Sequence, residues 1–172
     1  MSEPGWGRFP LPTPDGTAVL LGRWQPVRAA DLTAHRRELA AALHDGSRPA
    51  TVDEGAVERL LLVFEELASN ALRPGRTPVQ ATVTGDGTYW LLEVSDTAAD
   101  RPPAPAVDRD AAQGGLGLYL VARSCGAHGW FTDDGRKITW ARVDHSRAEA
   151  QHNVWQASPG AHGEHPHRGH GH

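Results

Sequence analysis

The stretch "EELASNAL", residues 65–72, sets two adjacent carboxylates and an asparagine into an otherwise apolar run. The apolar residues around them recur at helical spacing and predict a buried helix: Leu60, Leu61, Leu62, Val63, Phe64, Leu67, Ala68, Ala71 and Leu72. Glutamate is almost never fully buried unless it is paired, and asparagine is a weak helix former. Glu66 and Asn70 are four residues apart, so on a helix they share one face. We therefore expect other parts of the chain to supply contacts that offset the cost of placing Glu66 and Asn70 in this helix.

Around this helix, the chain alternates between helical and strand patterns. Thr51 and Glu54 form a T-x-x-E capping box that predicts a helix start near Val52, and the Pro-Gly pair at 74–75 ends the helix by Arg73. The other predicted elements are, in chain order, a strand (17–24), a helix (27–44), a hairpin (78–96), a helix opened by glycines (114–126) and a second hairpin (128–143) that turns at 133–135.

This order of elements predicts an α/β fold. We expect a two-layer sandwich in which a mixed, mostly antiparallel sheet carries three helices on one face. Residues 1–16 are rich in proline and glycine and predict a flexible N-terminal arm. Residues 17–143 form the folded domain, and residues 144–172 predict a disordered tail rich in histidine, with incidental metal affinity.

Composition excludes several classes of function. A net charge of −4 and a pI of about 6.2 give no electrostatic basis for direct nucleic-acid binding. No apolar run approaches the ~18 residues of a membrane span, and the first residues lack the pattern of a signal peptide. The single cysteine, Cys125, excludes an intramolecular disulfide and fits a reducing cytoplasm.

Two further candidate site features, an aspartate and a group of glycines, lie at the ends of predicted elements. Asp96 closes a strand, and the glycines within 114–117 open a helix whose free N–H groups suit a phosphate. Together with Glu66 and Asn70 they supply the carboxylates, the amide oxygen and the anion cradle that a nucleotide–Mg²⁺ site needs. Taken singly, each has a simpler reading: Glu66 as the surface partner of an arginine, Asn70 as part of a solvated stripe and Asp96 as a turn residue.

Three segments in this order resemble a known family. "EELASNALRPG" (65–75), "VSDTAADRPP" (94–103) and "GGLGLYLVARSCGAHGW" (114–130) are similar to the N, G1 and G2 boxes of the GHKL ATPase superfamily, which includes gyrase and the histidine kinases. The resemblance covers about residues 17–143 and implies a Bergerat-type ATP-binding fold. The small size, with no phosphoacceptor-histidine domain, favours the branch of the anti-sigma-factor serine/threonine kinases and their actinobacterial ATP-binding relatives.

The resemblance implies a role for each matching residue. Asn70 matches the asparagine that binds the Mg²⁺ bridging the phosphates, and Glu66 matches the glutamate that orients or deprotonates the attacking hydroxyl or water. Asp96 matches the acid that accepts a hydrogen bond from the adenine amino group, and Ala98 is small enough to let adenine approach. Glu65 is expected to point elsewhere, solvated or paired.

The lid and the phosphate turn follow from the same resemblance. Residues 99–113 match the mobile lid, and the nucleotide-binding residues after it are Gly114, Gly115, Gly117 and Leu118. Pro74 stands where this branch usually has a histidine, and we expect it to tune the site without abolishing it. Thr139 is one candidate for a threonine that many members place near adenine, but other registers of the last strand stay open.

The implied activity is transfer of the ATP γ-phosphate to a serine or threonine of a small anti-sigma-factor antagonist of the STAS type, in the cytoplasm. Two alternatives remain: an ATP-dependent switch that binds a partner without significant transfer, and a weak ATPase. An arginine in the first helix contacts protein partners in this branch, so Arg36 and Arg37 are either partner-binding residues or a solvated helix face. The sigma factor itself is a further candidate partner, and a homodimer stays open.

Overall fold

The computed structural model describes residues 6–14, 16–45, 52–74, 76–103 and 116–146. One sheet of five strands forms its back layer, in the order β1-β2-β3-β5-β4. The strands are β1 (Val19–Trp24), β2 (Gln80–Gly85), β3 (Tyr89–Asp96), β4 (Ala127–Asp133) and β5 (Arg136–Asp144). All four pairings between these strands are antiparallel, and the isolated bridge between residue 8 and residue 130 of β4 is parallel, in agreement with the predicted mostly antiparallel sheet. Two of the pairs, β2–β3 and β4–β5, are joined by hairpins, which require antiparallel pairing, whereas α1 and α2 lie between β1 and β2 in the chain.

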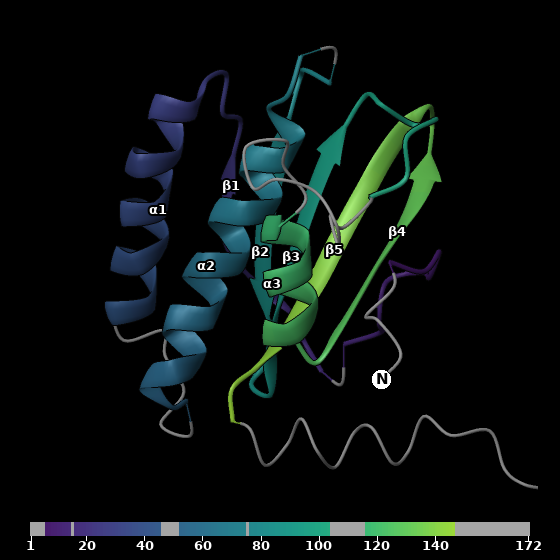
Figure 1. Ribbon diagram of the computed structural model, residues 1–172. Helices are drawn as coiled ribbons and strands as arrows, with labels where there is room; N and C mark the ends of the chain where they lie inside the picture. The colour runs from purple at the N-terminus through teal and green to yellow at the C-terminus, as the bar shows by residue number, and fades with distance from the viewer. Residues whose placement is uncertain (1–5, 15, 46–51, 75, 104–115, 147–172) are drawn as a thin grey trace, which may run out of the picture.

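Three helices cover one face of this sheet: α1 (Ala29–His44), α2 (Glu54–Ala71) and α3 (Leu116–Ser124) (Figure 1). Helix α2 lies between the other two and contacts both of them as well as β3 and β5. The predicted α/β sandwich with three helices on one face is therefore confirmed. Within the described residues, none of the helices is long and apolar enough to cross a membrane.

Helix α2 buries the apolar positions that the opening stretch predicted. Leu60, Val63, Phe64 and Leu67 follow the spacing i, i+3, i+4, i+7, and all four are buried in the main core. Burial of a Leu, Val or Phe side chain contributes roughly 1.5–3 kcal/mol, so this face alone holds the helix on the sheet.

The start of α2 differs from the predicted capping box. The N-cap is Asp53, whose carboxylate accepts a hydrogen bond from the Ala56 backbone N–H. Glu54 is then the first helical residue and cannot reach back as the third residue of a capping box does, and Thr51 lies outside the described residues. Aspartate caps a helix at least as well as threonine, which explains the shift of two residues.

The two hairpins confirm their predicted turns. Asp86 accepts hydrogen bonds from Thr88 and Tyr89 in the β2–β3 turn. In the β4–β5 turn Asp134 and Gly135 have positive φ angles of 47° and 73°. Two consecutive residues with positive φ are typical of the tight turns that match the twist of an antiparallel pair.

The N-terminal segment differs from the predicted flexible arm. Residue 8 pairs with residue 130 of β4, and the Trp140 indole N–H donates to the Phe9 carbonyl at 2.9 Å. Trp6 is buried in the main core, and its indole N–H donates to the Leu118 carbonyl. Residues 6–14 therefore lie along the β4 side of the sheet, and their aromatic side chains explain the attachment.

At the C-terminal end of the domain, the described residues continue slightly past residue 144, where the tail was predicted to begin. Strand β5 ends at Asp144, and His145 is buried against the Trp90 ring at 4.5 Å between centroids. The predicted histidine-rich tail from residue 147 onward lies outside the described residues.

Candidate nucleotide site

Glu66 lies where α2 meets the start of α3. A Cβ atom at position 117 would clash with Oε2 of Glu66 and would lie 2.8 Å from its Cδ. A side chain larger than glycine therefore fits at position 117 only if the Glu66 carboxylate moves away. The two residues, which are 51 positions apart in the sequence, were predicted to serve one site, and the structure brings them into contact.

The Glu66 carboxylate is only partly exposed. Burial, and to a smaller extent the neighbouring Glu65, raises the pKa of Glu66 above its usual value. Glu65 itself is exposed and pairs with Arg36 of α1 at 3.6 Å, so it points away from the site as expected. Arg37 is exposed on the same helix.

Asn70 lies one turn further along α2, beside two arginines that follow the helix. Arg76 Nη1 donates to the Asn70 backbone carbonyl at 3.4 Å. Burial, followed by repulsion from Arg76, lowers the pKa of Arg73. Within the described residues neither guanidinium pairs with a carboxylate, and Nε of Arg76 is buried without a hydrogen-bond partner. This end of α2 therefore carries positive charge that no carboxylate among the described residues neutralises.

Asp96, the last residue of β3, is buried on the helix-covered face of the sheet. Its Oδ1 accepts a hydrogen bond from the Ala98 N–H at 2.8 Å. The backbone N–H of Thr97 donates to the Arg76 carbonyl at 2.9 Å, which joins the end of β3 to the segment that follows α2. Arg76 thus links the residue that follows Asp96 to the Asn70 end of α2.

The buried partner of Asp96 is Lys137 of β5, directly opposite it in the β3–β5 register. Lys137 Nζ lies 3.5 Å from Asp96 Oδ2 and donates to the Arg101 carbonyl at 2.8 Å. The side chain of Lys137 is 0% exposed. Burial lowers the pKa of Lys137; Asp96 opposes this shift, whereas Arg76 and Arg101 add to it.

Lys137 was not among the predicted site residues, although the sequence pattern around it contained a signal. Residues alternate between the two faces of a strand, so Lys137 shares its face with Thr139, Ala141 and Val143. All of these are buried in the structure. A lysine on the apolar face of a strand requires a partner, and the nearest acid across the predicted sheet is Asp96.

Part of the predicted site is not tested. Gly114, Gly115 and most of the predicted lid (99–113) lie outside the described residues. Leu118 is buried in the core, and its carbonyl accepts the Trp6 indole N–H, so its side chain packs away from solvent. Pro74 is exposed at the end of α2.

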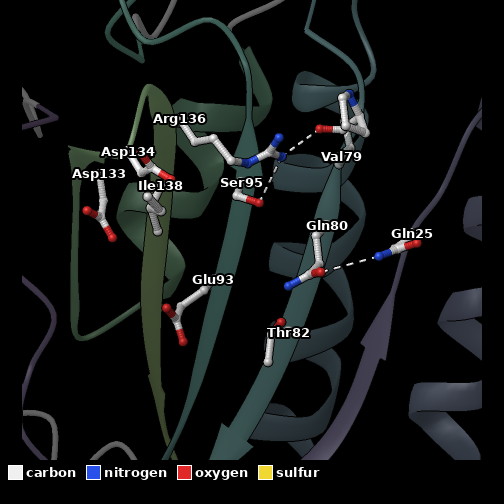
Figure 2. A pocket seen from close by; sticks show the side chains of 11 residues that line it. Gln25, Val79, Gln80, Thr82, Glu93, Ser95, Asp133, Asp134, Arg136 and Ile138 are labelled. Atoms are coloured by element: carbon white, nitrogen blue, oxygen red, sulfur yellow. Dashed lines mark hydrogen bonds between the residues drawn. The ribbon is translucent and has the colours of Figure 1, made fainter.

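A polar hollow of about 620 Å³ opens on the face of the sheet that the helices leave free (Figure 2). It is lined by strand residues such as Thr82, Glu93 and Ser95, and Arg136 crosses it to donate to the Ser95 hydroxyl and the Pro78 carbonyl. None of the predicted nucleotide residues lines this hollow. It is therefore separate from the site between α2, α3 and the end of β3.

Comparison with protein families identifies the domain to which both surfaces belong. Residues 26–143, well over half of the 172, match the family described as the histidine kinase-like ATPase domain. The chain belongs to this family. The predicted membership of the GHKL superfamily is thereby confirmed, and the chain is an ATP-binding domain. Comparison with curated proteins gave no match.

The residues of this histidine kinase-like ATPase domain fit a nucleotide with Mg²⁺. Asp96 offers a buried acceptor, while Arg73 and Arg76 offer cations that lack a carboxylate partner within the described residues. Phosphates are the natural counter-charge for such a pair of guanidinium groups. The Asn70 amide and the Glu66 carboxylate are oxygen donors of the kind that Mg²⁺ prefers. When bound, Mg²⁺-ATP would supply a transferable γ-phosphoryl group.

Proposed function

We propose that this domain is a protein kinase of the anti-sigma-factor type, which transfers the ATP γ-phosphate to a serine or threonine of a small STAS-like antagonist protein in the cytoplasm. Asp96 and Ala98 receive the adenine, Asn70 holds the metal, and Gly114, Gly115, Gly117 and Leu118 form the turn near the phosphates. Glu66 receives the proton of the attacking hydroxyl. Phosphoryl transfer depends mainly on positioning and charge stabilisation, which these groups supply.

The observation that carries the proposal is the position of Glu66 against Gly117. This contact sets a carboxylate at the first turn of α3, next to the proposed phosphate turn. Its raised pKa supports a role in proton transfer, because a general base works best when its pKa approaches the working pH. A carboxylate that only covered the helix surface would gain no stability from partial burial beside a glycine.

The charge around Asn70 supports the nucleotide part of the proposal. Arg73 and Arg76 repel each other, and bound phosphates would relieve this repulsion. Because Asn70 is proposed to hold the metal, Asn70→Ala should weaken binding of Mg²⁺-ATP more than it weakens binding of the metal-free nucleotide. Isothermal titration calorimetry with and without Mg²⁺ measures both affinities.

The decisive experiment uses ATP labelled at the γ-phosphate, the purified domain and candidate antagonist proteins recovered with it from its source. We expect label on a serine or threonine of the antagonist, and a loss of about 10²–10⁴-fold in rate for Glu66→Gln with nucleotide affinity retained. Glu65→Gln, one residue away on the exposed face, serves as the control and should keep the wild-type rate.

The same assay separates the alternatives. Tight, ATP-dependent partner binding without label would make the domain a switch, and release of labelled phosphate without a labelled protein would make it a weak ATPase. If Glu66→Gln still phosphorylates the partner at the wild-type rate, the role assigned to Glu66 is wrong. Direct binding of the sigma factor, and self-association into a homodimer, are tested by size-exclusion chromatography of the same mixtures.

A further inference from the structure

The Asp96–Lys137 pair has hydrogen-bonding capacity that the protein does not use. An ionised carboxylate has about four acceptor positions, and Asp96 Oδ1 uses one for the Ala98 N–H. Among the described residues, Oδ2 faces the Lys137 ammonium alone, at 3.5 Å. Asp96 is 2% exposed, so water does not fill the remaining positions freely. The carboxylate therefore retains acceptor positions that a hydrogen-bond donor of a ligand could use.

The ammonium of Lys137 is in a similar situation. It has three N–H donors. Within the part of the chain that the structure describes, its partners are the Arg101 carbonyl at 2.8 Å and Asp96 Oδ2 at the longer distance. One donor is left in a fully buried group, beside an acceptor that also has spare capacity. A ligand that offers a donor and an acceptor side by side would satisfy both.

Adenine has this arrangement on either side of its amino group. The 6-amino group is a donor, and the ring nitrogens N1 and N7 that flank it are acceptors. If Asp96 accepts from the amino group, as the proposed function requires, then the neighbouring ammonium lies on the side of one of these ring nitrogens. Bases that carry an oxo group at this position present an acceptor to the carboxylate instead, and they match the pair less well.

We propose that Lys137 is a specificity-determining residue of the nucleotide site, whose ammonium donates a hydrogen bond to a ring nitrogen of the adenine held by Asp96. This inference rests on the proposed function, since it assumes that Asp96 receives the base. In the structure the ammonium is held by Asp96 and the Arg101 carbonyl. On binding, it keeps the Arg101 contact and turns its remaining donor to the base.

The test compares ATP with 1-deaza-ATP and 7-deaza-ATP, each of which replaces one of the two ring nitrogens by C–H. Calorimetry on the wild-type protein should show that one analogue binds about tenfold more weakly than ATP or worse, because a hydrogen bond to a charged donor is lost. In Lys137→Met, ATP and that analogue should bind with equal affinity. Arg136→Met is the matched control: it removes a cation one residue away on the opposite face of the sheet, and it should keep the wild-type discrimination.

A second measurement does not depend on any variant. Lys137 is the only lysine of the chain, so lysine labelled with ¹³C and ¹⁵N gives a single side-chain signal by NMR. ATP should shift the ε-carbon and ζ-nitrogen resonances of this lysine. The analogue that binds weakly should shift them less at saturation, although it carries the same phosphates.

The outcomes are distinct. Equal affinity of the wild type for ATP and both analogues overturns the role of Lys137 but leaves ATP binding and the proposed function intact. Discrimination that persists in a folded Lys137→Met protein also overturns it. A purely structural lysine would weaken binding of ATP and both analogues by the same factor when replaced. If the wild type binds no ATP at all, this inference and the proposed function fall together.

Discussion

At the scale of single residues, Glu66 is a carboxylate whose surroundings favour its neutral form. Burial and the adjacent Glu65 raise its pKa in the folded protein above the reference value of 4.5. The folded state then binds more protons than the unfolded state between these two values, so stability falls as the pH rises through this window. At neutral pH the wild type carries the full cost of an ionised Glu66.

Glu66→Gln should therefore be more stable than the wild type at pH 7, and the difference should shrink as the pH falls to 4.5 and below. Urea unfolding at a series of pH values measures it. The control, Glu65→Gln, removes an exposed ion pair with Arg36 and should change stability by less than about 1 kcal/mol. A Glu66→Gln protein that is less stable than the wild type at pH 7 would mean that the carboxylate is held by favourable contacts instead.

A second prediction at this scale concerns Asp96. Asp96→Asn leaves the Lys137 ammonium buried without its carboxylate, and breaking a buried pair in this way costs about 3–5 kcal/mol. The double variant with Lys137→Met should recover part of this loss, because both charges are then absent. Chemical denaturation of the wild type, the two single variants and the double variant gives the coupling energy. Additive effects in this cycle would show that the two side chains do not interact.

At the scale of elements, the packing of α3 on α2 depends on Gly117. The missing Cβ lets the first turn of α3 approach the Glu66 carboxylate. Helix α3 is short, from Leu116 to Ser124, so a displacement at its first turn moves much of its length. The geometry of the proposed catalytic carboxylate and that of the phosphate turn are consequently coupled.

Gly117→Ala should destabilise the domain by about 1–3 kcal/mol, as overpacked positions do, and Glu66→Ala should relieve much of this loss in the double variant. Thermal unfolding of the four proteins measures the cycle. Gly55→Ala is the matched control, because position 55 lies in the first turn of α2 and a Cβ there would lie 3.1 Å from Arg59 Nη1 and 3.4 Å from Asp53 Oδ1, distances that need at most a small shift. This control should gain up to about 1 kcal/mol from helix propensity. A Gly117→Ala protein as stable as Gly55→Ala would contradict the contact.

At the scale of the whole molecule, the N-terminal segment contacts both layers of the fold, the sheet at β4 and the helical layer at α3. Its backbone pairs with β4 through the hydrogen bonds Phe9 N–H to Trp130 and Trp130 N–H to Gly7. Its first described residue, Trp6, packs 4.6 Å from the His128 ring and binds the backbone of α3. Helix α3 is therefore held between α2 on one side and a segment from outside the matched domain on the other.

Trp6→Ala should lower stability by about 3–5 kcal/mol, the usual cost of removing a buried aromatic side chain. Phe9→Ala is the control from the same segment: the Phe9 side chain is 55% exposed, and its backbone hydrogen bonds survive the substitution, so the loss should stay below about 1 kcal/mol. Equal losses in the two variants, measured by urea unfolding, would contradict the different roles given to them.

The sequence by itself determined the order of helices and strands, the turn at Asp134-Gly135, the face shared by Glu66 and Asn70, and the family. These features depend on periodicity, turn chemistry and local spacing, which act between near neighbours in the chain. The tertiary structure alone decided which distant residues meet. It set Gly117 against Glu66, placed Trp6 under α3 and paired Asp96 with Lys137. The alternation of residues in β5 indicated that Lys137 is buried, but only the pairing of β3 with β5 identified Asp96 as its partner. Such contacts depend on the register between strands and on the packing of helices across the sheet, and no local sequence pattern contains that information.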